Sequence, residues 1–331
     1  MSKTDFRSAV RDAISEEMRI DPTVVLFSED VGAAGGVFQA TRGLRELFGD
    51  ERVFDTPISE LALAGAAFGA AISGLRPIIE VMFGDFTPLV MDSLINQAAK
   101  YQFLTGGSCG VPLVVRSAVG GGGRFGAIHS QIPAPWLNNV PGIKIVAPST
   151  PSDARALLRS AIRDDNPVVF LEHKRLYNLQ GECRDEAVAI GSATVVRPGR
   201  DVTIAAVMTD VHKALSAADR LAHDGVSAEV IDLRTLRPLD LDTVVTSAKR
   251  TGKLVVVEEG PRTGGWAAEL VASVSEQFGD ITVWRVTSPD RPLPYSPPLE
   301  DATLPSAERI AESVLEKLRV SVNANKSRSG R

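Results

Sequence analysis

The amino-acid sequence predicts an α/β protein made of two tandem domains with mainly parallel sheets. The chain has 331 residues, about twice the usual size of one domain. Short β-branched runs alternate with amphipathic segments in two series, which the polar, turn-rich stretch CRDEAVAIGSATVVRPGRD separates. We therefore expect a first domain at 1–182, a connector at 183–200, a second domain at 201–320 and a disordered tail at 321–331.

The first series begins with an amphipathic helix and continues with strands that are apolar throughout. The expected strands are TVVLFSED, RVFDTPI, LRPIIEVMF, VPLVVRSAV, IKIVAPST and PVVFLEH. One helix is expected at about 60–73, and another is SDARALLRSAIR, for which Ser152 or Asp153 is a suitable N-cap. Continuous β-branched runs are typical of parallel strands that are covered on both faces.

The second series repeats this alternation. Its expected strands are VTIAAVM, SAEVIDL, KLVVVEE and ITVWRVT, and its expected helices lie at about 211–224, 240–250, 265–278 and 305–319. The last residues, NANKSRSGR, are small or polar and cannot form a packed core. This composition is the reason for expecting a disordered tail.

The composition excludes several classes of protein. A net charge of -5 and a pI near 5.5 provide no basic surface for nucleic acid or anionic lipid. The longest apolar run, 61–72, is too short to span a membrane, and the N-terminus has no signal-peptide pattern. Cys109 and Cys183 form no CxxC pair, so neither a disulfide framework nor a thiolate metal site is indicated. We expect a cytoplasmic protein.

Glu60 stands at the start of a helix that is otherwise apolar, and two interpretations are open. An acid in the first turn complements the helix dipole, a surface arrangement worth about 0.3–1 kcal/mol. Alternatively, a helix that is apolar on all sides is buried along its whole length. A buried carboxylate then needs a partner or a raised pKa, as in active sites. The helix also carries small residues that would allow a tight subunit contact: Ala62, Gly65, Ala66, Gly69 and Ser73.

The segment SAVGGGGRFGAIHSQ contains a GxGxxG pattern at Gly121, Gly123 and Gly126. A dinucleotide site would also need a following helix and an acidic residue about twenty positions later. Two prolines follow instead, and no acid stands in the corresponding stretch GIKIVAPS. We interpret the segment as a flexible loop in which the backbone approaches a neighbour closely.

His129 closes this glycine-rich loop. An isolated histidine is most often a surface or core residue, but a position beside a mobile loop is typical of active-site lids. No HExxH motif or second histidine at ligand spacing accompanies it, so a metal site is not indicated. Glu29 and Asp30 end the first strand at its carboxyl edge, where α/β proteins bind ligands, although a solvated acid pair would give the same pattern.

Several long blocks resemble a known family. They are LFSEDVG, RVFDTPISELALAGAAFGAAISGLRPI, VMFGDF, MDSLINQAAK, AIHSQ, PGIKIVAPSTPSDARALLRSAIRDDNPVVFLEH, VIDLRTLRPLD and YSPPLED. Together they resemble the β subunit of the thiamine-diphosphate-dependent decarboxylating component of 2-oxo acid dehydrogenase complexes, over nearly all of residues 5–318. Acetoin dehydrogenase β subunits are similar around VMFGDF.

The resemblance implies a pyrimidine-binding thiamine-diphosphate domain followed by a transketolase C-terminal domain. It also implies an α2β2 heterotetramer with cofactor at the α/β interfaces and a lipoyl-bearing acyltransferase core as partner. In this family Glu60 would hydrogen-bond the ring nitrogen of the cofactor's aminopyrimidine and promote formation of the ylid. Carbon–carbon bond cleavage and acyl transfer to a lipoyl group follow. His129 would assist that transfer, Glu29 would lie near the aminopyrimidine, and Phe86, or its neighbour Phe83, would pack on the ring.

The resemblance further implies that Mg²⁺ and the diphosphate are held by the α subunit. The GDG motif of thiamine enzymes is absent here, because Gly49-Asp50 and Gly84-Asp85 are each followed by another residue. This chain alone should therefore be inactive. In some members a monovalent cation such as K⁺ is bound at the positions of Leu113, Ala161, Asp164 and Asn166.

Other functions stay open at this point. A transketolase-like carboligase split over two chains would use the same cofactor, and a non-catalytic paralogue would only scaffold a complex. The presence of both Glu60 and His129 argues against the scaffold. Among pyruvate, branched-chain 2-oxo acids and acetoin, the resemblance around VMFGDF favours acetoin or pyruvate. About ten residues beyond the usual end of family β chains leave binding to a conventional core open.

Overall fold

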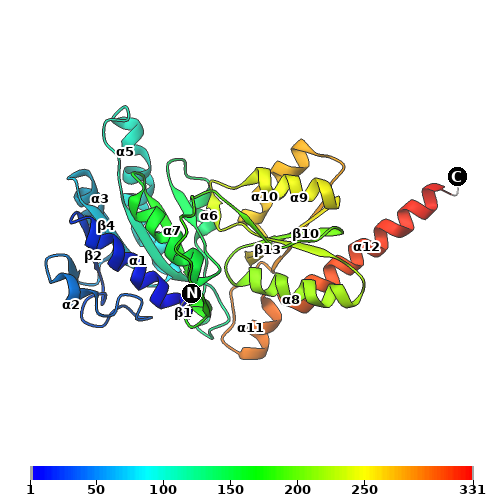
Figure 1. Cartoon of the computed structure of the whole chain (residues 1–331), viewed down its shortest axis with the longest axis horizontal. Coiled ribbons are helices and arrows are strands. Elements are labelled where there is room, and N and C mark those ends of the chain that lie inside the picture. Colours follow the sequence, from blue (N-terminus) through cyan, green and yellow to red (C-terminus); the bar gives the residue numbers. More distant parts are fainter. Residues whose placement is uncertain (1–2, 330–331) are drawn as a thin grey trace. The chain divides into compact units, whose positions relative to one another are not determined.

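The computed structural model describes the backbone of residues 3–329 and the side chains of residues 3–319. The chain forms two compact units, and Figure 1 labels many of their elements. The first comprises the residues up to Ser192 together with 234–239 and 293–295, and the second comprises the rest. The division after Ser192 falls inside the stretch 183–200 that was expected to be a connector.

The first unit is built on a seven-stranded sheet with the order β12-β6-β7-β5-β4-β2-β3. All neighbouring strands are parallel except β12, which pairs antiparallel with β6. All six strands expected in the first series are present, and their apolar residues are buried except Phe54 in β3, which is half-buried. The strands are β2 (Val24–Ser28), β3 (Val53–Asp55), β4 (Arg76–Val81), β5 (Val114–Val119), β6 (Lys144–Val146), β7 (Val168–His173) and β12 (Thr235–Arg237).

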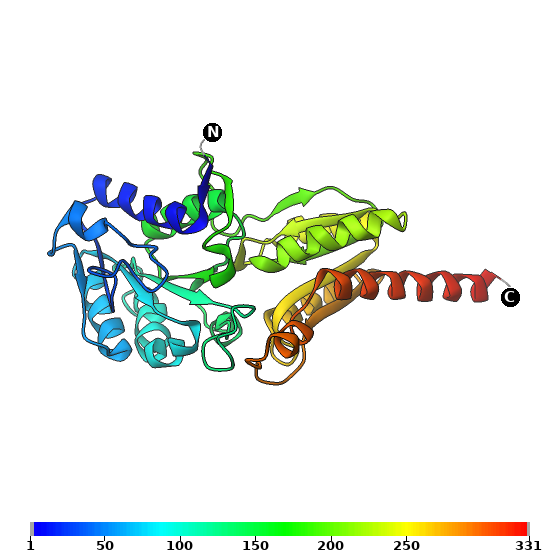
Figure 2. The same cartoon turned by 90° about the horizontal axis from the view of Figure 1, so that it is seen from below.

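Helices cover both faces of this sheet, as continuous apolar strands require. One layer contains α1 (Phe6–Ile20) and α7 (Pro151–Arg163), which pack against each other. The other layer, on the opposite side in Figure 2, contains α3, α4, η2 and α5. These elements are α3 (Glu60–Ile72), α4 (Thr87–Met91), the π-helix η2 (Asp92–Ala98) and α5 (Ala99–Leu104).

Shorter elements complete the first unit. A two-stranded antiparallel sheet, which the sequence did not predict, joins β1 (Lys3–Asp5) to β8 (Gln180–Glu182). The remaining helices have five residues or fewer: α2 (Leu44–Phe48), η1 (Gly84–Phe86), α6 (Ala134–Asn138) and η3 (Lys174–Leu176).

The expected N-cap of α7 was wrong. Thr150 caps this helix, and its hydroxyl accepts a hydrogen bond from the backbone N–H of Asp153 at 3.1 Å. Pro151 occupies the first helical position, where its missing N–H costs nothing. Ser152 and Asp153 therefore lie within the first turn of the helix.

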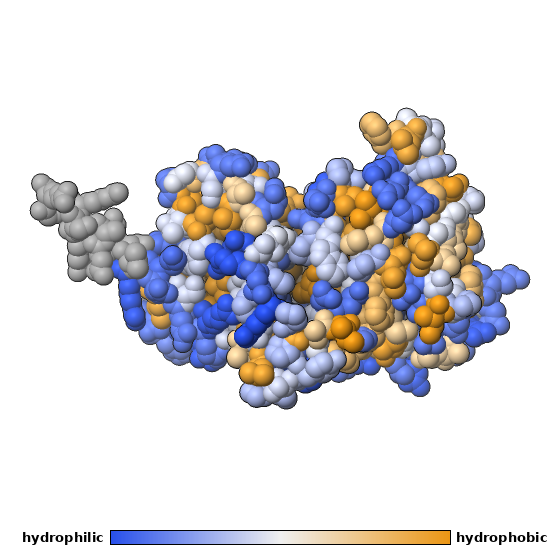
Figure 3. Space-filling model, turned by 180° about the vertical axis from the view of Figure 1, so that it is seen from behind, coloured by the Kyte–Doolittle hydropathy of each residue, from blue (hydrophilic) through white to orange (hydrophobic). Residues whose placement is uncertain are grey.

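The expectation that α3 is buried along its whole length was also wrong for the chain by itself. Leu63 and Ala64 are buried, but Leu61 is 57% exposed, and Ala62 and Ala66 are exposed as well. One side of the helix packs on the sheet, on α4 and on η2, while Leu61, Ala62 and Ala66 on its outer side stay exposed in the described part of the chain. Apolar residues also lie among polar ones on the surface of the first unit that Figure 3 shows.

The second unit contains a five-stranded sheet with the order β14-β13-β10-β11-β9. The four expected strands are present and mutually parallel, whereas β9 lies in the expected connector and pairs antiparallel with β11. The strands are β9 (Thr194–Arg197), β10 (Val202–Ala206), β11 (Ala228–Asp232), β13 (Lys253–Pro261) and β14 (Thr282–Ser288).

The described part of the second unit has five helices: four begin close to the expected positions, and the one at Pro297–Thr303 was not predicted. They are α8 (Thr209–His223), α9 (Leu241–Thr251), α10 (Trp266–Gln277), α11 (Pro297–Thr303) and α12 (Ala307–Ser329). Helix α12 extends into the segment 321–331, and the last two residues of that segment lie outside the described part of the chain. Disorder of this tail in solution stays a prediction. No helix between residues 3 and 329 has the length and apolarity that crossing a membrane requires.

Candidate active site

The residues singled out in the sequence follow four neighbouring parallel strands of the first sheet. Glu29 comes directly after β2, Glu60 follows β3, Phe86 follows β4, and His129 lies in the loop after β5. These strands are adjacent in the order β5-β4-β2-β3. Since the carboxyl ends of parallel strands meet at one edge of the sheet, the four residues lie on the edge where α/β proteins bind ligands.

Glu29 and Glu60 form a carboxylate pair at this edge. The backbone N–H of Ser59 donates to Oε1 of Glu29 at 3.1 Å, which connects Glu29 to the start of α3. Glu29 is buried, and Glu60 is half-buried. Burial raises the pKa of Glu29, the charge of Glu60 raises it further, and the Ser59 N–H opposes the shift. Glu29 therefore binds a proton more readily than an exposed carboxylate would.

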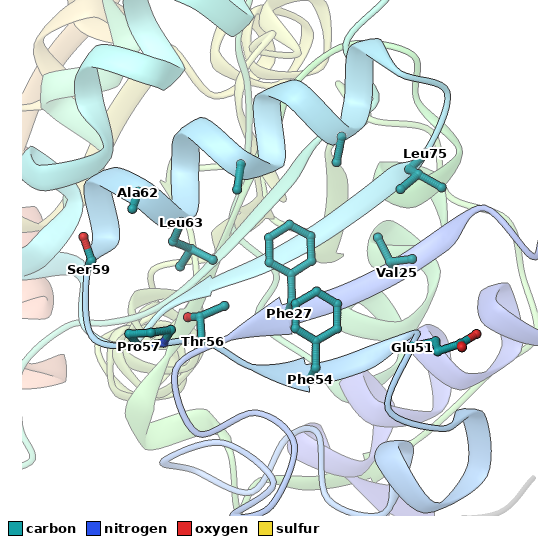
Figure 4. A pocket seen from close by; sticks show the side chains of 12 residues that line it. Val25, Phe27, Glu51, Phe54, Thr56, Pro57, Ser59, Ala62, Leu63 and Leu75 are labelled. Atoms are coloured by element: carbon teal, nitrogen blue, oxygen red, sulfur yellow. The ribbon is translucent and has the colours of Figure 1, made fainter.

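An apolar groove of about 410 Å³ runs beside α3, as Figure 4 shows. It lies along α3 and the two strands β2 and β3, where the rings of Phe27 and Phe54 stack with centroids 5.1 Å apart. Ser59 stands at one end of the groove, but neither Glu60 nor His129 lines it. The groove is thus an uncovered apolar surface that borders the carboxylate pair.

The imidazole of His129 packs against two phenylalanine rings from the loop after β4. The ring centroids of His129 and Phe83 are 4.4 Å apart, and those of His129 and Phe86 are 5.6 Å apart, both in edge-on geometry. Phe83 and Phe86 also contact each other edge-on at 5.9 Å. Because both rings lie against His129, the geometry does not select between them, and the assignment of Phe86 to a cofactor ring stays a prediction.

The glycine-rich segment is a loop, and α6, which follows it, has only five residues. Positive φ angles occur at Gly120, Gly122, Arg124 and Gly126, so of the three glycines of the GxGxxG pattern only Gly126 is among the residues with positive φ. These features agree with the interpretation as a loop rather than a dinucleotide site, which needs a long helix after the glycines.

Below this edge lies a buried ion cluster that sequence reasoning missed. The guanidinium of Arg116 on β5 donates two hydrogen bonds to Glu172 on β7, at 2.7 and 2.9 Å, and one to Glu80 on β4, at 2.8 Å. The hydroxyl of Tyr177 donates to Glu172 at 2.9 Å. Arg116 and Glu172 are 0% exposed. A signal was present, because each of three apolar strands, IIEV, VVRSAV and FLEH, carries a single charge.

The electrostatics of this cluster favour a charged arginine. Burial disfavours its charge, but Glu172 and Glu80 outweigh this effect, so the pKa of Arg116 lies above its ordinary value. Burial raises the pKa of Glu80 despite the neighbouring guanidinium. Burial and the Glu172 carboxylate raise the pKa of Tyr177, so its phenol keeps its proton. Arg116 is therefore the group of this cluster whose charged form is most strongly stabilised.

The residues proposed to bind a monovalent cation lie in three places: Ala161 near the end of α7, Asp164 and Asn166 in the turn after it, and Leu113 directly before β5. The backbone N–H of Asp164 donates to the Ala161 carbonyl at 3.3 Å, and the N–H of Asn166 donates to Oδ1 of Asp164 at 2.9 Å. The Leu113 carbonyl accepts a hydrogen bond from β7. The ammonium of Lys144 donates to Oδ2 of Asp164. The donor set is made of oxygens, as alkali cations prefer, but a cation here stays a prediction.

A conventional metal centre is a separate matter. Among the residues that the structure describes, no group of three or more His, Cys, Asp or Glu side chains could hold a metal ion.

Comparison with known proteins identifies the two units. Residues 2–180 match the transketolase pyrimidine-binding domain, and residues 191–310 match the transketolase C-terminal domain. The β subunit of split gene transketolase, solved as an inactive β4 tetramer, superposes with a TM-score of 0.79 at 24% identity, covering 94% of this chain and 97% of that chain. This likeness concerns the fold, which is the α/β, two-domain arrangement expected from the sequence.

Two relatives extend the comparison to named enzymes. The chain is 47% identical to the β subunit of acetoin:2,6-dichlorophenolindophenol oxidoreductase of Cupriavidus necator, over 93% of this chain and 96% of that protein. It is 43% identical to the β subunit of 2-oxoisovalerate dehydrogenase of Bacillus subtilis, over 96% and 99%. The chain therefore belongs to the transketolase-like family of β subunits of 2-oxo acid and acetoin dehydrogenases.

Proposed function

We propose that this chain is the β subunit of a thiamine-diphosphate-dependent 2-oxo acid or acetoin dehydrogenase that acts with an α subunit in an α2β2 heterotetramer. The observation that carries the proposal is the carboxylate pair, in which buried Glu29 stands beside Glu60 at the carboxyl edge of the sheet. In a protein that only scaffolds a complex, nothing would require two like charges to be held together at this position.

Thiamine diphosphate, when bound, supplies an electron sink for cleavage of the carbon–carbon bond next to the substrate carbonyl. The residues present fit its aminopyrimidine half, because Glu60 offers a carboxyl group at the N-terminus of α3 and Phe86, at the same carboxyl edge of the sheet, offers an aromatic ring. Glu60 would hold a proton at a ring nitrogen. Glu29 would assist from beside it, because burial and the charge of Glu60 favour the protonated form of Glu29.

His129 would move a proton during acyl transfer to the disulfide of a lipoyl group, which becomes acyl-dihydrolipoyl. Its imidazole lies edge-on against Phe83 and Phe86, which limits its rotation. A histidine can donate or accept a proton near neutral pH. It therefore suits a step in which the lipoyl disulfide acts as the oxidant: one sulfur bonds to the acyl carbon, the sulfur–sulfur bond breaks, and the other sulfur takes up a proton. The acceptor would be a lipoyl-bearing acyltransferase core.

The diphosphate half would be held by the α subunit through Mg²⁺. No GDG motif occurs in the sequence, so the ligands for this ion must come from another chain. The uncovered outer side of α3, including Leu61, supports the presence of a partner near the carboxylate pair. A monovalent cation at Leu113, Ala161, Asp164 and Asn166, and a cytoplasmic location, belong to the same proposal.

Among the substrates, acetoin or pyruvate is favoured over a branched-chain 2-oxo acid. The support is the VMFGDF block and the identity of 47% with an acetoin-oxidising relative. One methylene group more or less in an apolar pocket changes the discrimination between two substrates by only about 1–3 kcal/mol. The choice of substrate therefore depends on details of the pocket, including the residues that the α chain contributes. A two-chain carboligase is the alternative, and product analysis with and without a lipoyl acceptor separates the two reactions.

Native mass spectrometry of the chain isolated from its own cells, with thiamine diphosphate and Mg²⁺ present, tests the proposal. The expected species is a heterotetramer that carries two cofactors, and the α chain found in it would narrow the choice of substrate. A homo-oligomer or monomer that binds no cofactor under these conditions would refute it. Glu60 would then serve only as an acid that complements the helix dipole.

A further inference from the structure

The loop that carries His129, residues 120–133, has little conformational constraint of its own. Gly120, Gly122 and Gly126 adopt φ angles of 88°, 77° and 69°, and Arg124 adopts 64°. Glycine enters this left-handed region freely because it has no Cβ, but it also has the largest choice of other conformations. The position of His129 must therefore depend on contacts between the loop and its surroundings.

The segment after β7, residues 173–175, supplies such contacts. A Cβ added at Gly120 would lie 2.1 Å from Nε2 of His173, so the two residues are in close contact and only glycine fits. Arg175 donates from Nη1 to the carbonyl of Gly122 at 2.8 Å. The first turn of the loop is thus fixed against the end of the neighbouring strand β7.

Lys174, between these two residues, reaches the other end of the loop. Its side chain is buried, and its ammonium donates a hydrogen bond to the carbonyl of His129. The same ammonium stands 5.4 Å from the ring centre of Phe83 and 5.0 Å from that of Phe125. Cation–π attraction is strongest where the cation is desolvated, as it is here.

These contacts bear directly on the orientation of the imidazole. Phe83 is the ring against which His129 packs most closely, at 4.4 Å between centroids, and Phe125 belongs to the loop itself. Lys174 thus binds the His129 backbone and, at the same time, the ring that limits its side chain. Neither contact depends on the imidazole nitrogens, which stay available for proton transfer.

We propose that Lys174 is a positioning residue for His129. It fixes the glycine-rich loop so that the imidazole faces the substrate side of the carboxyl edge during acyl transfer. This inference rests on the proposed function of His129. It assigns a supporting role in that function to a second residue of the first unit. A displacement of about 1 Å in a catalytic group can lower a rate by roughly 10²-fold, so loss of this contact should be measurable.

The test compares three variants in the complex purified with its α partner. Lys174→Met keeps the length of the side chain and removes the ammonium, whereas Lys174→Arg keeps a cation that can donate and stack. Lys249→Met is the matched control, because the Lys249 ammonium lies 3.8 Å from the ring centre of Phe278 in the second unit. Three quantities are measured: acyl transfer to a lipoyl domain, oxidation with 2,6-dichlorophenolindophenol, and the rate of trypsin cleavage after Arg124.

The expected result is selective. Lys174→Met should lower acyl transfer by about 10- to 10²-fold, retain dye-linked oxidation and speed cleavage after Arg124. Lys174→Arg should restore much of the transfer, and Lys249→Met should resemble the parent. Unchanged transfer and cleavage in Lys174→Met would overturn the proposal. An equal loss of both activities without rescue by arginine would also overturn it, since that pattern indicates a general role in folding.

Trypsin cleavage needs neither cofactor nor α subunit. If the proposed function fails, which full activity of a Glu60→Gln variant would reveal, the cleavage rates still report whether Lys174 fixes the loop. Failure of the positioning role and failure of the proposed function are thereby distinguished.

Discussion

The backbone N–H of Ser59 donates a hydrogen bond to Oε1 of Glu29, 3.1 Å away. This bond connects the residue that follows β2 with the residue that precedes α3. Glu29, which follows β2, and Glu60, which follows β3 in the chain, therefore lie close together. Burial and the charge of Glu60 raise the pKa of Glu29. Glu29 therefore binds a proton more readily than an exposed carboxylate does, beside the residue that would contact the ring nitrogen.

Replacement of Glu60 by glutamine should lower turnover of the α2β2 complex by roughly 10²-fold or more, the scale of lost general acid–base catalysis. Glutamine keeps the size and the polar character of the side chain but cannot exchange a proton with a ring nitrogen. Turnover is measured at saturating thiamine diphosphate, so that weaker cofactor binding does not contribute.

Glu51→Gln is the matched control for this experiment. Glu51 is an exposed glutamate that lines the apolar groove beside α3, and its loss should leave turnover at the parental rate. If Glu60→Gln and Glu51→Gln behaved alike, Glu60 would have no catalytic role.

Replacement of His129 by alanine should impair acyl transfer to a lipoyl domain by about 10²- to 10⁴-fold. Dye-linked oxidation needs no lipoyl acceptor, because the dye takes the electrons instead of the lipoyl disulfide, so it should be affected much less. Both rates are measured on one preparation of the complex, with His223→Ala as control, because His223 is exposed at the end of α8. Parallel loss of the two activities would contradict a role confined to acyl transfer.

Much of the fold could be predicted from the sequence because its strands are continuous apolar runs. All ten expected strands are present, and α3 begins at Glu60 as expected. The edge strands β9 and β12 were not predicted, since Thr194–Arg197 and Thr235–Arg237 are short and lie among turn residues. Strands of three or four residues acquire their identity from a partner strand rather than from their own pattern.

The candidate site could be predicted only in part. Glu60 and His129 were found through sequence position and resemblance, whereas the proximity of Glu29 to Ser59 depends on the pairing of β2 with β3. Lys174 and the glycine loop meet because β5 and β7 are neighbours, although the two segments are far apart in the sequence. Contacts between distant segments are set by strand order, which hydrophobic periodicity does not reveal.

Removal of the charge from Arg116 should destabilise the first unit strongly. Arg116→Met would leave the buried carboxylates of Glu80 and Glu172 without their cation, a loss of about 3–5 kcal/mol in the free energy of unfolding. Arg11→Met is the control, because the Arg11–Asp12 pair is exposed and worth about 0–1 kcal/mol. Urea unfolding of both variants measures the difference, and similar midpoints would show that the buried cluster is not needed for stability.

In the second unit, Glu258 should make stability depend on pH. Burial raises its pKa to about 7, although the backbone N–H groups of Ala267 and Trp266 donate to its carboxylate at 3.0 Å; Asp210 raises the pKa further, and Arg285 lowers it. The folded chain therefore binds a proton that the unfolded chain releases near pH 4.5. The resulting stability is complete below this pH and is lost as the pH rises through about 7, by about 3 kcal/mol in total.

Urea unfolding between pH 5 and pH 8 measures this effect as a slope, which separates it from any constant cost of a substitution. Glu258→Gln cannot titrate, so its free energy of unfolding should fall less steeply with pH than that of the parent chain. Glu276→Gln, on the exposed side of α10, should keep the parental slope. Parallel curves for the parent and Glu258→Gln would mean that the Glu258 carboxyl is ionised throughout, with the two N–H groups at the start of α10 outweighing its burial.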